Sequence, residues 1–199
     1  VRDDAFGIGL LSSSNNTVTG NIVRSNGEDG IVLSSSSNNN TVTGNTVGSN
    51  GAHGIRLSSS SNNTITGNIA ELNGGNGIYL YTSSYNTVTG NTLESNDGTG
   101  IFLYQNSNNN AINGNIIESS NGHGIGLSSA AHYNTVTGNT VVLSGLNGIY
   151  LSDSSNNIVT SNVSTNNSQG GAGSCGIYLS FSDYNIITSN RCTDDQAVK

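Results

Sequence analysis

The sequence has no proline, methionine or tryptophan, and only 9% of its residues are charged. Lysine and arginine total 5 against 12 aspartate and glutamate residues, which gives a formal net charge of −7. The few basic residues form no cluster, so we expect no nucleic-acid partner. No stretch approaches the ~20 consecutive apolar residues of a membrane-spanning helix, so we expect no membrane insertion.

Cysteine and histidine are also scarce, with 2 and 3 residues respectively. No spacing among them fits a zinc site, and we predict no metal site and no cofactor. We interpret His53, His123 and His132 as solvated polar residues. Cys175 and Cys192 leave two interpretations open: a free thiol with Cys192 as a small core residue, or a disulfide that fastens the end of the chain in an oxidising compartment.

One short pattern fills the chain eight times. Its first element, Gly-Ile-x-Leu, begins at Gly7, Gly30, Gly54, Gly77, Gly100, Gly124, Gly148 and Gly176, in steps of 23 or 24 residues and a last step of 28. Its second element, Asn-x-Val/Ile-x-x-Asn, begins at Asn16, Asn40, Asn63, Asn86, Asn110, Asn134, Asn157 and Asn185. A fixed step of this length is typical of a solenoid. The longer last step indicates a Gly-rich insertion at 167–174.

Apolar and small polar residues alternate within each repeat, which is the period of a β-strand. Serine, asparagine and glycine separate these short segments and favour tight turns. Each repeat therefore predicts one coil of three short strands and three corners. Consecutive coils bury their apolar residues only if the strands pair in parallel. In-register stacking places equivalent residues ~4.8 Å apart, so the repeated asparagines are expected to hydrogen-bond amide to amide along the axis.

These motifs resemble the right-handed parallel β-helices of the pectate-lyase-like superfamily, in particular the NosD-like and archaeal surface-protein repeats. The shared run Asn-Thr-Val-Thr-Gly-Asn occurs at 40–45, 86–91 and 134–139. The resemblance implies an all-β, right-handed parallel β-helix of about eight coils, as one domain over residues 1–199. The copper association of the NosD name does not carry over, because methionine is absent and histidine rare. The scaffold hosts lyases, hydrolases, epimerases, adhesins and spacers, so it leaves function open.

The weakly charged surface suits a secreted protein, extracellular or at the cell surface. Asn-x-Ser/Thr sequons begin at Asn15, Asn39, Asn62, Asn162 and Asn166. They indicate either N-glycosylation or no more than the composition of the repeat. Neither end shows an obvious cap, and solenoids need caps to stay separate. We therefore expect the chain to continue in a longer parent or to associate end to end.

The residue between Ile and Leu of the first element is expected to point outward. In chain order it is Gly9, Val32, Arg56, Tyr79, Phe102, Gly126, Tyr150 and Tyr178. With Tyr81 and Tyr104 two residues further on, the prediction is one exposed patch of Tyr79, Tyr81, Phe102 and Tyr104 beside Arg56. Such aromatic platforms suit sugar rings. The alternative is that these aromatic residues only favour β structure. Arg56 has no acidic partner in its own column.

Threonine pairs form two further outward columns. They are Thr17 and Thr19, Thr41 and Thr43, Thr64 and Thr66, Thr87 and Thr89, and Thr135 and Thr137. A flat threonine array is typical of ice-binding β-helices, and a stacked solenoid supplies its regularity. Ala111 and Asn113 interrupt the array, and Ile158 and Ile186 weaken it. Threonine is also simply a favoured strand residue.

A third column holds Glu71, Glu94 and Glu118 in consecutive coils. Stacked carboxylates ~5 Å apart suggest a cation site, the carboxyl pair of a retaining glycosidase, or a solvated acidic strip. We therefore carry three hypotheses. The first is a non-catalytic structural or adhesive β-helix module that contacts a glycan or cell-surface polymer. The alternatives are an ice-binding protein and a polysaccharide lyase or glycosidase.

Overall fold

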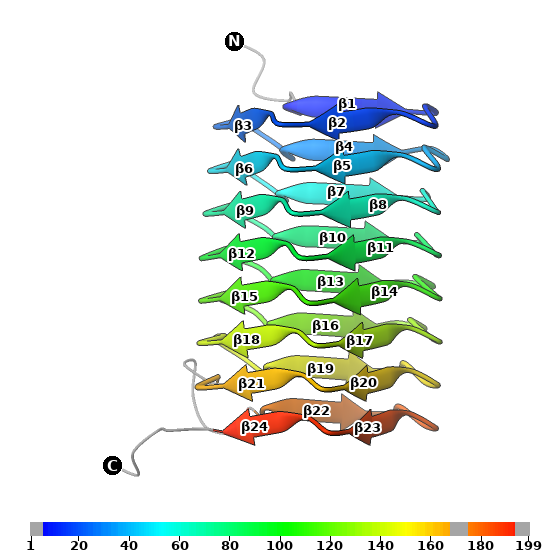
Figure 1. The fold of residues 1–199 in the computed structure, drawn as a ribbon, viewed down its shortest axis with the longest axis vertical. Helices are drawn as coiled ribbons and strands as arrows, with labels where there is room; N and C mark the ends of the chain where they lie inside the picture. Colours follow the sequence, from blue (N-terminus) through cyan, green and yellow to red (C-terminus); the bar gives the residue numbers. More distant parts are fainter. Residues whose placement is uncertain (1–5, 168–174, 194–199) are drawn as a thin grey trace.

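A computed structural model of the chain describes residues 6–167 and 175–193. All regular structure in this part of the chain is β-strand, arranged as eight stacked coils of three strands each (Figure 1). The predicted all-β parallel β-helix is thus confirmed. These residues include no helix with the length and hydropathy that a membrane crossing requires. Of the predicted insertion at 167–174, only Asn167 lies within the described residues.

Corresponding strands of the eight coils form three parallel sheets, which we name A, B and C. Sheet A consists of β1 (Ile8–Leu11), β4 (Ile31–Ser34), β7 (Ile55–Ser58), β10 (Ile78–Tyr81), β13 (Ile101–Tyr104), β16 (Ile125–Ser128), β19 (Ile149–Ser152) and β22 (Ile177–Ser180). Sheet B consists of β2 (Thr17–Thr19), β5 (Thr41–Thr43), β8 (Thr64–Thr66), β11 (Thr87–Thr89), β14 (Ala111–Asn113), β17 (Thr135–Thr137), β20 (Ile158–Thr160) and β23 (Ile186–Thr188). Sheet C consists of β3 (Ile22–Arg24), β6 (Thr46–Gly48), β9 (Ile69–Glu71), β12 (Thr92–Glu94), β15 (Ile116–Glu118), β18 (Thr140–Val142), β21 (Val163–Thr165) and β24 (Arg191–Thr193).

The register places every residue beside its equivalent one repeat away. Leu80, for example, lies between Leu57 and Leu103 in sheet A. Each coil directs residues of all three sheets inward, such as Leu80, Val88 and Leu93, which are fully buried. Because one coil contributes so few apolar residues, the core is thin and exists only as a continuous stack.

The two predicted asparagine ladders are present, and Asn91 shows how they work. Its side-chain oxygen accepts the backbone N–H of Asn68 at 2.9 Å and the Asn68 side-chain amide at 3.0 Å. Its own amide nitrogen donates to Asn115 Oδ1 at 3.0 Å and to the carbonyl of Ile65 at 2.9 Å. Buried corners leave backbone groups that need such partners. The ladder supplies them from one coil to the next.

Further ladders occupy corners where the sequence pattern is less regular. Between sheets C and A, Asn26, Asn50, Asn73 and Asn96 repeat the amide stack at 2.8–2.9 Å. The next two coils hold serine there, and the buried hydroxyls of Ser120 and Ser144 have no hydrogen-bond partner. Between sheets A and B, serine hydroxyls accept backbone N–H groups of the preceding coil, as Ser83 does from Ser60 at 3.1 Å.

The two cysteines form neither the predicted disulfide nor a buried core thiol. Cys192 takes the predicted inward place, opposite Ser164. Both Cys175 and Cys192 are free and exposed. The structure therefore contains no disulfide between them, and Cys192 is not a buried core thiol, because it belongs to the last described coil.

We expect Asn91→Ala to lower the free energy of unfolding by about 3 kcal/mol or more, since it leaves several buried polar groups unpaired at ~1–3 kcal/mol each. Urea denaturation followed by circular dichroism measures the change. Asn21→Ala is the matched control in the first coil, where the side chain donates to Asn45 and Thr19 and is only partly buried. It should cost about 1 kcal/mol. Equal losses in both variants would contradict the ladder account.

Candidate functional site

The predicted aromatic cluster is formed on the outward side of β10 and β13. Tyr79 lies opposite Phe102, and Tyr81 lies opposite Tyr104. The ring centroids are 5.8 Å apart in the first pair and 6.2 Å apart in the second, with interplanar angles of 15° and 28°. Phe102 and Tyr104 are also stacked, at 5.5 Å. We call Tyr79, Tyr81, Phe102 and Tyr104 the aromatic patch.

The patch does not present the flat ring faces that the sequence suggested. Neighbouring rings stack on one another along the axis and all four side chains are partly buried, so much of each ring face lies against another ring. Burial raises the pKa of the Tyr79 phenol, against a smaller lowering by Arg56. The phenol is therefore neutral and able to donate a hydrogen bond. The patch ends over Gly126, where an added Cβ would lie 2.8 Å from the Phe102 ring.

Arg56 lies beside Tyr79, as predicted, but it is not alone. Its Nη1 pairs with the carboxylate of Asp29 at 3.3 Å, and Asp29 is only 2% exposed. Asp29 also accepts the backbone N–H of His53 at 2.8 Å. Sequence reasoning missed this pair because Asp29 belongs to a corner and not to the Arg56 column. A buried carboxylate thus holds the cation of the site in place.

The histidines are not merely solvated, because each is partly buried and accepts a backbone N–H of the next coil. The Nδ1 atom of His53 accepts the backbone N–H of Asn76 at 2.9 Å. The Nδ1 atom of His123 likewise accepts the backbone N–H of Asn147 at 3.2 Å. The His123 ring stacks on Tyr150, with the ring centroids 4.3 Å apart. His132 accepts the N–H of Ser155 at 2.8 Å. Each bond requires a neutral imidazole with its proton on Nε2.

Burial lowers the pKa of both His53 and His123. For His53 the carboxylate of Asp29 opposes this effect, and the Arg56 guanidinium adds to it. Asn76 and Asn147 occupy the same corner column as His53 and His123. Their Oδ1 atoms accept the backbone N–H of Thr99 at 2.7 Å and of Cys175 at 2.6 Å, respectively. Asparagine is therefore a non-titrating substitute for histidine in this column.

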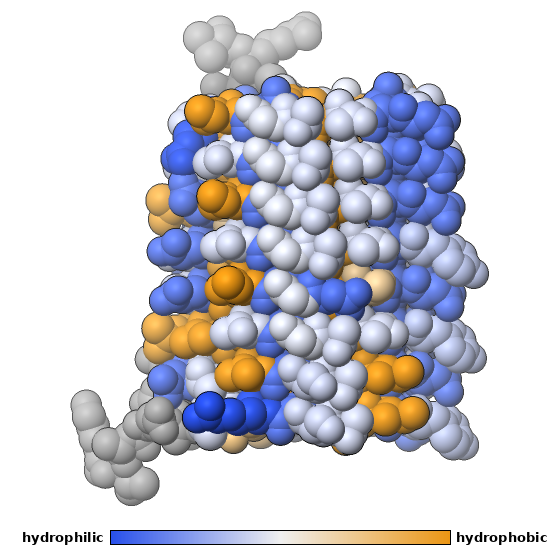
Figure 2. Space-filling view, viewed as in Figure 1, coloured by the Kyte–Doolittle hydropathy of each residue, from blue (hydrophilic) through white to orange (hydrophobic). Residues whose placement is uncertain are grey.

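The threonine columns of sheet B stand in register, with Thr17, Thr41, Thr64 and Thr87 one above another. The interruption at Ala111 and Asn113 is present. A neighbouring outward column on sheet C continues the face with Ile22, Thr46, Ile69, Thr92, Ile116 and Thr140. Figure 2 shows this side as pale columns with scattered orange residues. The face is wider than the two threonine columns predicted from the sequence.

The glutamates also stack as predicted, with Glu94 between Glu71 and Glu118 on sheet C. Glu71 forms an ion pair with Arg24, two coils away, across Gly48. Sheet C does not contain the aromatic patch, which lies on sheet A. Among the described residues no group of three or more His, Cys, Asp or Glu is arranged to hold a metal ion.

The sequons divide by burial. Asn15, Asn39 and Asn62 are exposed at the corner between sheets A and B. Asn162 is buried, and its amide donates to Asn190 Oδ1 at 2.9 Å and to the carbonyl of Val136 at 2.9 Å. The Asn162 sequon is thus part of the ladder motif.

Residues 1–141 match the protein family described as right handed beta helix region, so the chain belongs to that family. Residues 117–198 match a second family, the periplasmic copper-binding protein NosD. A search of curated proteins gave no match.

Solved structures show the same fold. The periplasmic alginate epimerase AlgG superposes with a TM-score of 0.84 at 23% identity, over 93% of this chain and 47% of AlgG. The A-module of the mannuronan C-5 epimerase AlgE4 from Azotobacter vinelandii gives 0.74 at 14% identity, over 91% and 60%. A tailspike protein of the Escherichia coli bacteriophage CAB120 gives 0.71 at 14% identity, over 91% and 30%. The chain spans about half the length of AlgG.

We expect stability to fall as the pH drops below about 6.5, the usual histidine pKa in an unfolded chain. The lowered pKa of His53 and His123 means that the folded state favours the neutral rings. The unfolded chain then binds more protons, so the stabilisation is complete above that pH and is lost toward the lower folded-state pKa. Urea midpoints between about pH 7.5 and 5 measure the effect. The double variant His53→Asn and His123→Asn should flatten the profile, and an unchanged slope would contradict this account.

Proposed function

We propose that the protein is a non-catalytic β-helix module, secreted or periplasmic, that binds polysaccharide through the outward side of sheet A. The observation that carries the proposal is the gathering of four aromatic side chains from two adjacent strands beside Arg56. The similarity of the fold to alginate and mannuronan epimerases supports a polysaccharide partner. The match to the periplasmic NosD family supports a location outside the cytoplasm.

The chemistry of the patch suits a saccharide chain that runs along the solenoid axis. Phenol hydroxyls of Tyr79, Tyr81 and Tyr104 offer donors and acceptors. The Arg56 guanidinium adds a further donor, held by Asp29 at one side. The two coils of the patch place their equivalent groups ~4.8 Å apart. Because ring faces are occupied by neighbouring rings, hydrogen bonds and ring-edge contacts carry the binding.

The carboxylate and the imidazole nearest the patch already have hydrogen-bond partners within the protein. Asp29 is buried and bound to both Arg56 and the His53 backbone. His53 Nδ1 accepts the Asn76 N–H. The stacked glutamates lie on sheet C. A glycosidase or lyase needs an acid and a base beside the sugar, so this arrangement favours binding without turnover.

We expect the double variant Tyr81→Ala and Tyr104→Ala to raise the Kd for the bound polysaccharide about tenfold, because aromatic contacts contribute ~0.5–1.5 kcal/mol each. Affinity electrophoresis against a glucan, a mannan and polymannuronate measures retention. The control Thr43→Ala with Thr66→Ala changes sheet B and should bind like the parent. If the Tyr81→Ala with Tyr104→Ala variant is retained as strongly as the parent protein, the proposed binding site is refuted. Release of cleavage products from any of the polymers would refute the non-catalytic role.

Ice binding is a second candidate, favoured by the corner between sheets B and C. Six coils place glycine there with positive φ, and each leaves the space around its missing side chain open: Gly20, Gly44, Gly67, Gly90, Gly114 and Gly138. In these six coils no side chain therefore stands between the threonine columns and the Ile/Thr column of sheet C. Arg191 is the one charged residue in these three columns. A smooth uncharged array of methyl and hydroxyl groups suits the ordering of water.

If this face binds ice, the protein shows thermal hysteresis in a nanolitre osmometer, and Thr66→Lys in the middle of the array abolishes it. The patch variant Tyr81→Ala with Tyr104→Ala should retain the full effect, since it leaves sheet B unchanged. Ice crystals that grow unaltered in the parent protein would rule out this candidate.

A further inference from the structure

One corner column contains tyrosines in a backbone conformation that suits asparagine. The column lies between sheets A and B, directly before the first asparagine of each ladder motif. Its φ is positive in every coil. Five coils hold asparagine: Asn15, Asn39, Asn62, Asn109 and Asn156. The other three hold Tyr85, Tyr133 and Tyr184, at φ of 59°, 57° and 56°. We call these three residues the tyrosine column.

The backbone conformation and the exposure of the tyrosine column both work against stability. Asparagine enters the left-handed region more easily than a bulky residue does. The three tyrosines are also 61%, 59% and 83% exposed. Positive φ recurs at other corners of the coils, so the three large exposed rings are what distinguish the tyrosine column. Packing therefore does not explain the choice of tyrosine.

The rings of the tyrosine column keep their faces free. In the described part of the chain their one aromatic contact is between Tyr133 and His132, at 6.3 Å and an edge-on angle of 69°. The aromatic patch differs, because its rings occupy consecutive coils and stack on each other. Free aromatic faces that carry a hydroxyl at the edge suit the apolar face of a sugar ring.

The spacing of the column is regular. Tyr85, Tyr133 and Tyr184 belong to the coils of β11, β17 and β23, so an asparagine coil separates each pair. Two coil rises place the rings ~10 Å apart along the axis. This is close to the length of two sugar units in an extended, equatorially linked chain. Successive rings would meet every second sugar.

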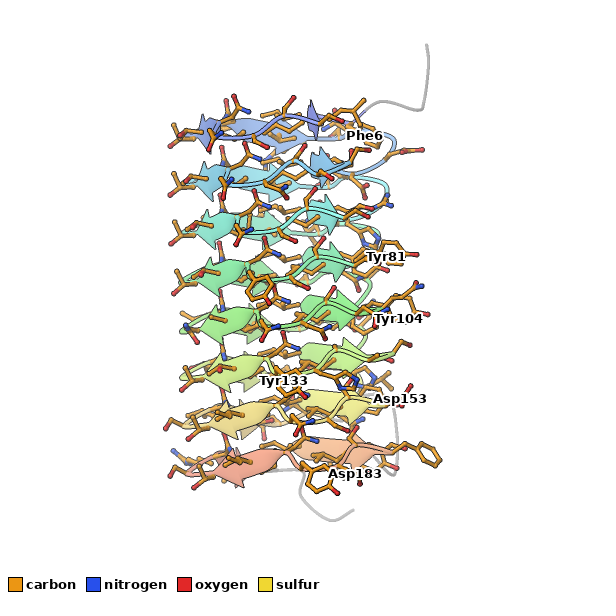
Figure 3. All side chains as sticks on the ribbon, turned by 90° about the vertical axis from the view of Figure 1, so that its right-hand side faces the viewer. Phe6, Tyr81, Tyr104, Tyr133, Asp153 and Asp183 are labelled. Atoms are coloured by element: carbon orange, nitrogen blue, oxygen red, sulfur yellow. The ribbon has the colours of Figure 1, made fainter. Side chains whose placement is uncertain are left out.

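The charge of this side selects among such chains. Asp153, Asp183 and Tyr133 are exposed, and they lie on the same side of the solenoid as the partly buried Tyr81 and Tyr104 (Figure 3). The chain as a whole has a net charge of −7. Both features repel a polyuronate, so they favour a neutral glycan.

We propose that a neutral, extended polysaccharide lies along the corner between sheets A and B and stacks one sugar on each of Tyr85, Tyr133 and Tyr184. The inference rests on the proposed function, polysaccharide binding, and names the class of ligand and its path. It predicts that affinity depends on chain length in steps of two sugars. A disaccharide reaches one tyrosine, and a hexasaccharide reaches more than one.

The test is isothermal titration of the full chain with cellohexaose, mannohexaose and hexa-N-acetylchitohexaose, beside their disaccharides and hexamannuronate. We expect at least one neutral hexasaccharide to bind tenfold or more tightly than its disaccharide and than hexamannuronate. The variant Tyr85→Asn, Tyr133→Asn, Tyr184→Asn should lose this binding tenfold or more. It should melt no lower than the parent, because asparagine is the usual residue of the column.

Two controls separate this inference from the proposed function. Thr43→Ala with Thr66→Ala changes only sheet B, so it should leave hexasaccharide binding unchanged. If the column variant binds as the parent does while Tyr81→Ala with Tyr104→Ala loses binding, the column is refuted and the proposed function stands. If no oligosaccharide and no polymer binds, both are refuted. A column variant that unfolds would show a structural role and overturn the inference.

Discussion

The fold depends on the exact stacking of each corner amide on its equivalent in the next coil. An asparagine side chain has one acceptor oxygen and a donor nitrogen with two hydrogens, so each member accepts from one neighbouring coil and donates to the other. Asn91 does this while it also satisfies the carbonyl of Ile65. No single coil can satisfy these groups alone. The register of all three sheets follows, and with it the columns on which any function must be built.

Outward columns acquire different properties from their place in the coil. On a strand, aromatic residues in consecutive coils stack and hide their faces, as Tyr79 and Phe102 do. At a corner, tyrosines separated by an asparagine coil keep their faces free, as Tyr133 does. Glycine at another corner leaves a face smooth. One repeat thus produces a hydrogen-bonding patch, a row of separate platforms and a flat array without any change of backbone.

The sequence predicted which residues share a column. It predicted less about the contacts and the chemistry of each column. The period and the alternation yielded the coils, the strands, two ladders and the contact of Arg56 with Tyr79. The third ladder was missed because serine replaces asparagine at Ser120 and Ser144. The Asp29 pair, the histidine bonds and the ring orientations were missed for another reason. Periodicity fixes neither the side-chain directions at corners nor the ring torsions on the strands.

Hydrogen exchange of asparagine side-chain amides, measured by NMR, tests the central claim most directly. If the amides form internal stacks, the side-chain NH₂ protons of Asn91 and of Asn110 exchange far more slowly than those of Asn109, which is exposed beside the same ladder. Protection should be greatest in the middle coils and decrease toward both ends. Ladder amides that exchange as fast as Asn109 would contradict the account.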